Sequence, residues 1–342
     1  MDEAGLAEVA GADAFLVGGV IRDELLGRPI VDVDIACADP EAAARAWAER
    51  TGGALVRLSE RHGAWRVAFR GGTTVDFAPL RGTIEEDLAT RDFTANAIAR
   101  PLERPGHVDP LGGLADLEAR ILRAVSDEIF LDDPLRLLRA VRLEEELGFA
   151  LVPETEALVR RDAALADRSA GERILGELER MGEPGIRRLD ELGLLAPLGG
   201  SLERLDAAAP CATKGYALAL ALGDALFRLP ISNDLRRFAS VLDRAVRPAD
   251  DSARAIHRFR RATEPWALEA LAALGETDLV PAVEAARAAD PAEPLLRGDE
   301  LGLPEGPEIG RMLERIAEER AAGTLSTREE ARELVRREAG KG

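Results

Sequence analysis

The chain has 342 residues, which is long enough for two or three domains with their own cores. Hydrophobic residues make up 46% and charged residues 32%, a composition that is typical of globular proteins and excludes a disordered or fibrous one. The formal net charge of −18 argues against nonspecific binding to nucleic acid or to an anionic membrane. Because Lys214 and Lys341 are the only lysines, the positions of the arginines carry more information than the total charge.

Short strand-like and helical segments alternate over about the first 125 residues. We expect strands at 14–17, 31–37, 56–58, 65–69 and 74–78, and helices at 20–26, 41–51 and 84–99. After Asp133-Pro134 almost the whole chain has helical periodicity. The predicted fold class is therefore α+β, with a small mixed-sheet head followed by an all-helical remainder.

Turn residues at Gly199-Gly200 and between Pro291 and Pro294 indicate further boundaries. The expected domains are a head at 1–125, a neck at 126–200, a body at 201–290 and a tail at 291–342. Two cysteines, Cys37 and Cys211, are too few for a disulfide framework and favour a reducing compartment. No apolar run reaches transmembrane length and no signal peptide opens the chain, so we expect a cytoplasmic protein with no membrane partner.

A glycine pair follows the first predicted strand. Gly18 and Gly19 lead into a helix that carries Arg22 in its first turn. Glycines let backbone N–H groups approach an anion, and an arginine can bind phosphate oxygens with two hydrogen bonds. An ordinary strand-to-helix turn is the alternative. The GxGxxG pattern is absent, which argues against a dinucleotide-binding enzyme.

Two aspartates alternate with apolar residues in the second predicted strand. Asp32 and Asp34 point to the same side, roughly 6–7 Å apart, while Val31, Val33 and Ile35 are expected to face the core. Such a pair is suited to holding Mg²⁺ ions that bridge a triphosphate. A solvated strand face is the alternative, but the preceding glycine turn supplies the other half of a nucleotidyl-transfer site. Asp76, in a later strand, either faces this pair or is an exposed strand residue.

The segment LVGGVIRDELLGRPIVDVDIA resembles the signature of the class II tRNA nucleotidyltransferase and bacterial poly(A) polymerase family. Further segments at 91–98, 109–114, 132–142, 172–177 and 297–310 are similar to the later motifs of that family. These matches extend from residue 15 to about 335, although 201–290 holds no motif of this kind. The resemblance implies a nucleotidyltransferase-type head and helical neck, body and tail, with tRNA and a nucleoside triphosphate as substrates.

The resemblance also implies roles for individual residues. It assigns catalysis to Asp32, Asp34 and Asp76, with two Mg²⁺ ions on the first two. It assigns nucleotide binding to residues of the glycine turn, the 91–98 segment and the neck helix: Gly18, Gly19, Arg22, Arg91, Asp133, Arg136, Arg139 and Arg142. Asp133 and Arg136 would pair with the Watson–Crick edge of the incoming CTP or ATP. Helix capping by Asp133, and ion pairing of Arg139 and Arg142 with the glutamates at 144–146, are the alternatives.

The connection between Asp76 and Arg91 is short, whereas CCA-adding members of this family usually carry a longer flexible loop there. Members that lack the loop include enzymes that add only the two cytidines, so we expect CC addition to tRNA. The alternatives are a full CCA-adding enzyme, an A-adding enzyme and a bacterial poly(A) polymerase. A more remote one is a non-catalytic RNA-binding relative, against which the intact aspartate pair argues.

Arginines concentrate in one part of the helical remainder. From residue 235 to 261 the chain has eight arginines and three aspartates, a local charge of +5. We expect a contact with the tRNA backbone there, through Arg236, Arg237, Arg244, Arg247, Arg254 and Arg258. A solvated helix face is the alternative. The acidic total therefore does not exclude RNA; no DNA partner is expected, and we expect a monomer or a homodimer.

Overall fold

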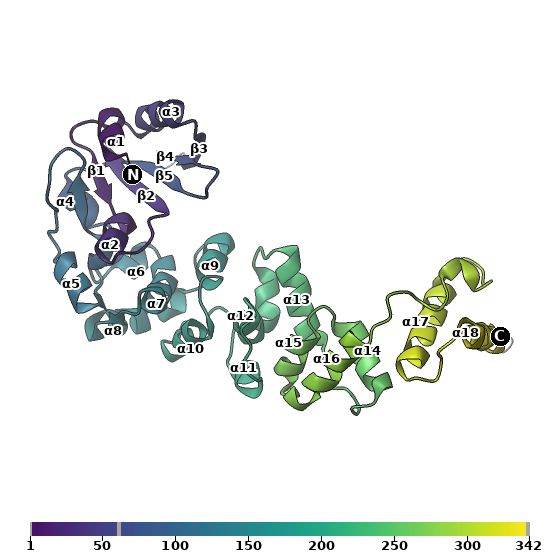
Figure 1. Ribbon diagram of the computed structural model, residues 1–342. Helices are drawn as coiled ribbons and strands as arrows, with labels where there is room; N and C mark the ends of the chain where they lie inside the picture. Colours follow the sequence, from purple (N-terminus) through teal and green to yellow (C-terminus); the bar gives the residue numbers. More distant parts are fainter. Residues whose placement is uncertain (1, 60–62, 340–342) are drawn as a thin grey trace. The chain divides into compact units, whose positions relative to one another are not determined.

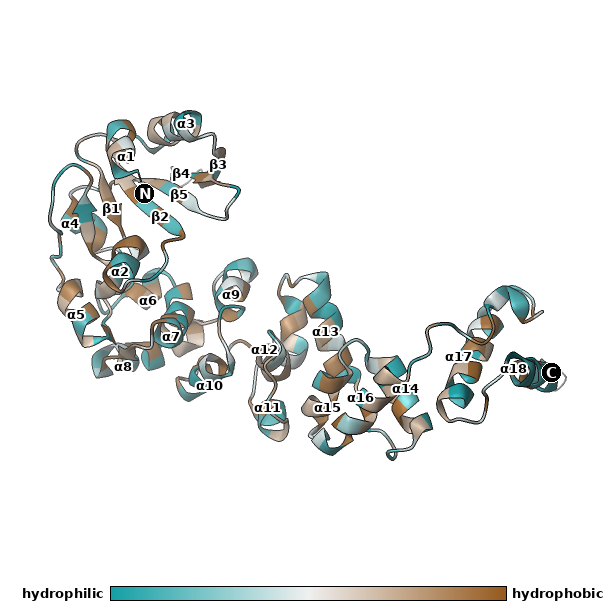
Figure 2. Ribbon diagram, in the orientation of Figure 1, coloured by the Kyte–Doolittle hydropathy of each residue, from teal (hydrophilic) through white to brown (hydrophobic). Residues whose placement is uncertain are grey.

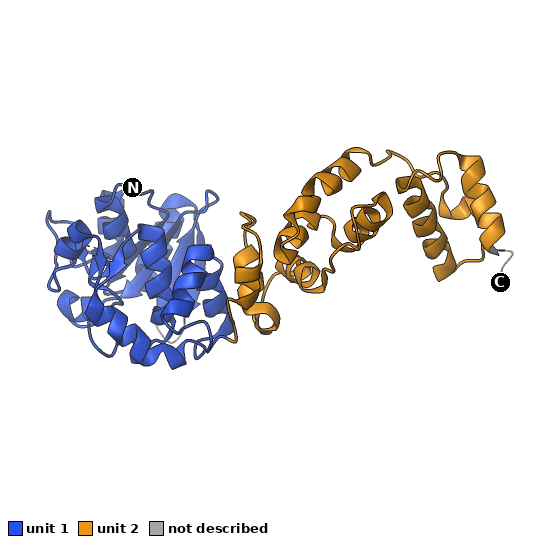
Figure 3. Cartoon of the chain, turned by 90° about the horizontal axis from the view of Figure 1, so that it is seen from below, with its two compact units in different colours: residues 1–198 blue, residues 199–342 orange. Residues whose placement is uncertain are grey.

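The computed structural model describes residues 2–59 and 63–339. The chain forms two compact units, residues 1–198 and residues 199–342 (Figure 3). This division falls beside Gly199-Gly200, where turn residues indicate a boundary. The boundaries expected near 125 and 290 remain predictions.

In the described part of unit 1, six strands form one mixed sheet in the order β3-β4-β5-β2-β1-β6 (Figure 1). The bounds of the strands are Phe15–Val17 (β1), Asp32–Cys37 (β2), Ala54–Ser59 (β3), Ala64–Ala68 (β4), Thr74–Pro79 (β5) and Ala99–Pro101 (β6). The β2–β5 pair is parallel, and the other neighbouring pairs are antiparallel. The predicted α+β class is confirmed.

One face of the sheet is covered by helices. Helix α1 (Glu3–Ala10) packs on α3 (Pro40–Thr51), and α3 contacts β3, β4 and β5. The Arg45 guanidinium of α3 lies 5.4 Å from the ring centre of Trp65 on β4, so α3 lies on the Trp65 face. Because alternate side chains of a strand point to opposite faces, Arg66 of β4 lies on the other face.

The helix expected over 84–99 is wrong in its second half. Helix α4 covers Ile84–Leu88, a 3₁₀ turn (η1) covers Thr94–Asn96, and β6 follows. Side chains of this segment make tertiary hydrogen bonds: Arg139 Nε donates to Asp92 Oδ2 at 2.9 Å, and Thr94 Oγ1 donates to an Asp116 carboxylate oxygen at 2.6 Å. These bonds compete with a continuous helix and override the local helical propensity.

The remainder of unit 1 is mainly helical. Its further elements are α2 (Gly19–Leu25), α5 (Gly113–Ala119), β7 (Ile121–Leu122), α6 (Ile129–Asp132), α7 (Leu135–Leu147), β8 (Ala150–Leu151), α8 (Pro153–Asp162), η2 (Ala163–Leu165), α9 (Gly171–Leu178) and α10 (Glu183–Glu191). Helix α7 buries Leu137, Leu138 and Val141 and packs on α9 and α10. Its opposite side carries arginines, and this amphipathic pattern orients them away from the core.

Unit 2 is helical throughout its described residues, as expected. Its helices are α11 (Glu203–Ala207), α12 (Tyr216–Leu222), η3 (Gly223–Arg228), α13 (Asn233–Arg244), α14 (Ala253–Thr263), α15 (Ala267–Leu274), η4 (Thr277–Leu279), α16 (Val280–Ala288), η5 (Gly298–Glu300), α17 (Pro307–Ala321) and α18 (Arg328–Ala339). Figure 2 shows that α15 is largely hydrophobic and α18 largely hydrophilic. Among the described helices, none is both long enough and apolar enough to cross a membrane.

Candidate active site

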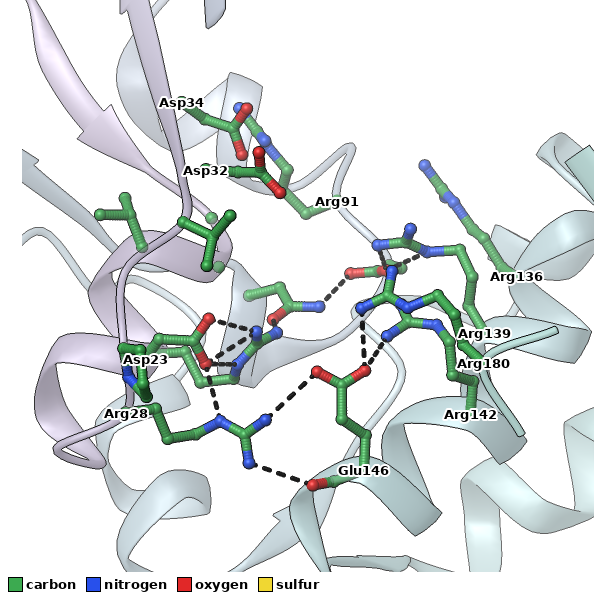
Figure 4. A pocket seen from close by; sticks show the side chains of 18 of the residues that line it. Asp23, Arg28, Asp32, Asp34, Arg91, Arg136, Arg139, Arg142, Glu146 and Arg180 are labelled. Atoms are coloured by element: carbon green, nitrogen blue, oxygen red, sulfur yellow. Dashed lines mark hydrogen bonds and ion pairs between the residues drawn. The ribbon is translucent and has the colours of Figure 1, made fainter. Parts of the chain in front are cut away.

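A pocket of about 590 Å³ opens in unit 1 beside the glycine turn and β2 (Figure 4). It brings together residues from the turn before α2, the start of β2, the segment around Arg91, and helices α7 and α9. The predicted residues among its lining are Gly18, Gly19, Arg22, Asp32, Asp34, Arg91, Asp133, Arg136, Arg139 and Arg142. Residues more than 100 positions apart in the sequence thus surround one cavity.

The glycine turn permits a close approach to the aspartates. Gly18 has a φ of 78°, in the left-handed region that favours glycine. A Cβ atom there would lie 3.4 Å from Arg91 Nη1 and 3.5 Å from Asp34 Oδ2. Gly18 therefore leaves this narrow part of the pocket clear between a guanidinium and a carboxylate.

Asp32 and Asp34 lie on the same side of β2, and Figure 4 shows both carboxylates at one end of the pocket. Asp32 is exposed and accepts a hydrogen bond from Thr74 Oγ1 at 2.7 Å. Asp34 is half-buried, and burial, with the negative charges of Asp76 and Asp32, raises its pKa to about 6 against the attraction of Arg91. Burial and the neighbouring carboxylates outweigh the arginine charges, so a bound cation would further stabilise the ionised Asp34 carboxylate.

The donor set fits Mg²⁺ shared with a substrate. Within the described ranges, no group of three or more histidine, cysteine, aspartate or glutamate side chains is arranged to hold a metal ion. Magnesium is commonly bound through one or two carboxylates, with waters and substrate phosphates as its other ligands. Asp32 and Asp34 meet this requirement, and the triphosphate would supply further oxygens.

Asp76 lies next to Asp34 but has a cation of its own. The two residues are partners in the parallel β2–β5 register. Both oxygens of Asp76 accept hydrogen bonds from Arg66, from Nε at 2.7 Å and from Nη2 at 2.7 Å. Neither Asp76 nor Arg66 lines the pocket. The structure therefore places Asp76 beside the aspartate pair and binds it to an arginine.

Asp133 and the first two arginines of α7 reach the pocket from the other side. Asp133 pairs with Arg173 at 2.7 Å, and its Oδ1 also accepts from Leu135 N at 3.3 Å. Arg136 Nη2 donates to the Thr90 carbonyl at 2.6 Å. Arg139 pairs with Asp92 at 2.8 Å; burial would raise the pKa of Asp92, but Arg139 and Asn96 more than offset it and hold that pKa below its usual value.

Two predicted nucleotide-binding arginines are held by carboxylates of the chain. Buried Arg142 pairs with Glu177 and with Glu146, the last of the nearby glutamates named as alternative partners. Buried Arg22 donates to Asp23 through Nε at 3.0 Å and to Asn96 Oδ1 at 2.6 Å. Their guanidiniums are thus oriented by fixed partners.

Several lining residues were not predicted as site residues, among them Asp23, Arg28, Asp92, Glu146, Arg173 and Arg180. Glu146 pairs with Arg28 at 3.3 Å and with Arg180 at 3.1 Å (Figure 4). Its position four residues after Arg142 on one helix is a signal that the sequence contained. The approach of Arg28 and Arg180 requires the tertiary structure.

Of the six predicted RNA-binding arginines of unit 2, three are ion-paired with glutamates and three lie on α13. Arg254 pairs with Glu319 at 2.6 Å, Arg258 with Glu318 at 2.6 Å, and Arg247 with Glu276 at 2.9 Å. The other three, on α13, are exposed; the Arg236 guanidinium lies 5.8 Å from the Phe227 ring centre. Among the described residues, Arg237 and Arg244 have no ion pair or side-chain hydrogen bond. Arg247 and Arg258 are exposed as well, but each is ion-paired.

A mixed sheet that carries an aspartate pair beside a glycine turn and an arginine-lined pocket defines a nucleotidyltransferase. The family model described as the poly A polymerase head domain matches residues 14–123. The A-adding tRNA nucleotidyltransferase of Deinococcus radiodurans is 35% identical, over 95% of both chains. The CC-adding tRNA nucleotidyltransferase of Thermus thermophilus is 32% identical, over 94% of this chain and 93% of that protein. The chain belongs to the tRNA nucleotidyltransferase family and is an enzyme.

Two other similarities agree with this assignment. The CC-adding tRNA nucleotidyltransferase of Geobacter sulfurreducens is 47% identical over 52% of this chain, an alignment that spans 42% of that protein. The structure of the Thermotoga maritima CCA-adding enzyme complexed with tRNA has a TM-score of 0.76 and 23% identity, over 98% of this chain and 94% of that one. The latter shows a shared fold, and the family resemblance of the sequence is confirmed.

Proposed function

We propose that this enzyme adds two CMP residues from CTP to the 3′ end of tRNA, without a nucleic-acid template, in the cytoplasm. The observation that carries the CC-specific part is the connection after β5. Strand β5 ends at Pro79 and α4 begins at Ile84, which leaves residues 80–83 between them. A reciprocal capping box of Thr83 and Glu86 fixes the start of α4 there. The long flexible loop expected of CCA-adding members has no room in this connection.

The geometry around β2 supports the binding of the triphosphate and the transfer of its nucleotidyl group. Asp32 and Asp34 would hold two Mg²⁺ ions, which when bound supply Lewis-acid stabilisation of the phosphates and activation of the acceptor hydroxyl. Arg91, beside Gly18, would contact the triphosphate, while Arg22 is kept in place by Asp23 and Asn96. The acceptor 3′ oxygen bonds to the α-phosphorus, the bond to pyrophosphate breaks, and the hydroxyl proton is released.

The base of the incoming nucleotide would be recognised at the start of α7. Asp133 and Arg136 line the same pocket and present a carboxylate and a guanidinium, which together can accept from and donate to a base edge. Arg136 is tethered to the Thr90 carbonyl, so its remaining N–H groups have a restricted direction. Thr90 lies just after α4, the helix that begins at the end of the short β5–α4 connection. The length of this connection can therefore influence the position of Arg136, and through it the choice of nucleotide.

A-adding activity is the second candidate, because the D. radiodurans relative bears that name at 35% identity over nearly the full chain. The experiment offers the enzyme two tRNA transcripts, one lacking the three terminal nucleotides and one ending in CC, each with CTP and ATP. We expect two cytidines on the first and no addition to the second, resolved on a sequencing gel. Addition of adenosine to the second would refute CC specificity, and Asp32→Ala controls for a contaminating activity.

A further inference from the structure

The face of the head sheet opposite α3 carries a row of polar and apolar side chains that leads away from the aspartate pair. In the strand registers, Asp34 of β2 is opposite Asp76 of β5, Asp76 is opposite Arg66 of β4, and Arg66 is opposite Val56 of β3. Partners in register share a face, so these four side chains lie in one line across the sheet. The helix that contacts β3, β4 and β5, α3, lies on the opposite face with Trp65.

The direction from which an acceptor must arrive follows from the pocket. The nucleotide pocket includes Gly18, Arg91 and the aspartate pair, but not Asp76 or Arg66. In phosphoryl transfer the attacking and leaving oxygens lie roughly in line on opposite sides of the phosphorus. Since the departing pyrophosphate would occupy the pocket side, the acceptor hydroxyl must approach from the β5–β4 side of Asp34. That side is the row of Asp76, Arg66 and Val56.

We propose that Arg66, held in place by its ion pair with Asp76, binds a backbone phosphate of the acceptor RNA next to its 3′ end. This inference rests on the proposed function. Arg66 lies two strand spacings from β2, about 10 Å, which is within the reach of one nucleotide. Its side chain is 37% exposed, whereas that of Asp76 is 18% exposed, so the guanidinium is accessible beyond its carboxylate partner.

The chemistry of the row suits single-stranded RNA. Arg66 uses Nε and Nη2 on Asp76, which leaves Nη1 to donate to a phosphate oxygen. A fixed guanidinium loses little side-chain entropy when it binds, because its partner already holds it. Beyond Arg66, Val56 is 45% exposed, and this apolar side chain on the edge strand can contact a ribose or base of the preceding nucleotide.

The test separates acceptor binding from CTP binding. The variant Arg66→Gln removes the guanidinium and keeps the Asp76 carboxylate. We expect the KM for tRNA that lacks its terminal CCA to rise roughly tenfold, the loss typical of a charge-assisted hydrogen bond. The KM for CTP should stay near that of the wild type. The slope of log KM for tRNA against log salt should fall by about 0.7, as for one phosphate contact to a single strand.

A conservative variant and a control complete the experiment. Arg66→Lys, which keeps the positive charge, should retain the salt slope. Arg45→Gln, on the helix that covers the other face of the same sheet, should alter neither the KM for tRNA nor the KM for CTP; circular dichroism verifies folding of each variant. An unchanged KM for tRNA in Arg66→Gln would overturn the inference. A wild-type enzyme that extends no tRNA would instead refute the proposed function.

Discussion

The arginines of the two units differ in whether their ion pairs leave the guanidinium groups facing a cavity. Around the unit 1 pocket, carboxylates pair with arginines that line the same cavity, as Glu146 and Glu177 do with Arg142. These arginines therefore face one cavity. On α14 of unit 2, Arg254 and Arg258 instead meet glutamates of α17 across a helix–helix contact. There the ion pairs join two helices.

This difference shows that the density of arginine in a sequence is a weak guide to an anion site. The segment 235–261 has a local charge of +5, yet several of its arginines are neutralised by glutamates that lie 50 or more residues later in the chain. The pocket region belongs to an acidic part of the chain and still gathers guanidiniums around one cavity. The positions of the carboxylate partners, and not the net charge, distinguish the pocket region from the segment 235–261.

The largest expected contrast between the units is in catalysis. Asp34→Asn removes the half-buried carboxylate of the proposed metal pair, and we expect kcat for CMP incorporation to fall by at least about 10²–10³-fold, as for loss of a major electrostatic group. No single arginine substitution in unit 2 should approach that loss. Incorporation of radiolabelled CMP measures both, with the exposed Asp13→Asn as the control. Retention of activity in Asp34→Asn would break the assignment of the site.

The second contrast concerns stability. Arg142→Ala leaves the buried Glu177 carboxylate without its main partner, and we expect a loss of about 3–5 kcal/mol in the free energy of unfolding of unit 1. Arg258→Ala in unit 2 removes a side chain that is 63% exposed, and the loss should be below about 1 kcal/mol. Urea denaturation of the two variants compares them directly. Equal losses would show that the two kinds of ion pair are energetically alike.

A third prediction uses the pH dependence of the site in metal-free buffer. The pKa of Asp34 is raised from 3.8 to about 6, so the folded state binds a proton more tightly than the unfolded chain. Its contribution to stability therefore falls as the pH rises from about 4 to 6, by about 1–3 kcal/mol, and stays low above that range. Thermal unfolding against pH should show this loss in the wild type and not in Asp34→Asn. Added Mg²⁺ should restore stability at pH 7 in the wild type alone.

The smallest effects are expected on α13. Arg237 and Arg244 are exposed without side-chain ion pairs among the described residues, and each should contribute one phosphate contact if unit 2 binds the tRNA backbone. Substitution of both by glutamine should weaken tRNA binding a few-fold and reduce the salt slope by about 1 to 2. The paired Arg258 should have less effect when substituted. Filter binding over a range of salt concentrations compares them, and an unchanged slope would exclude α13 as an RNA surface.

The alternation of polar and apolar residues, together with the spacing of the motifs, predicted much of the sheet and of the aspartate pair in unit 1. The strand over 31–37 and the shared side of Asp32 and Asp34 follow from period-two patterning, and β2 has this arrangement. The partner of Asp76 could not be predicted, because the approach of Arg66 depends on the β4–β5 register. The helix expected over 84–99 failed because buried Asp92, Thr94 and Asn96 bond to side chains whose positions only the tertiary structure defines.

In the helical part, local spacing was informative and long-range pairing was not. The steps of three from Asp133 to Arg142 place four residues of one helix region on the pocket, and Glu146 is within one turn of Arg142. Glu177 reaches Arg142 from α9, and Glu318 reaches Arg258 from α17, across separations that periodicity does not encode. Helix positions were therefore predictable, whereas the charges that neutralise each other were not.

The most direct test of the central claim is the product of the wild-type enzyme on tRNA that lacks its terminal three nucleotides, with CTP and ATP both present. The short β5–α4 connection predicts that the product grows by two cytidines and stops, and that a purified tRNA ending in CC is not extended. A product that ends in CCA would contradict the link between the connection and nucleotide choice. A lack of any addition would contradict the assignment of tRNA 3′-end synthesis to this pocket.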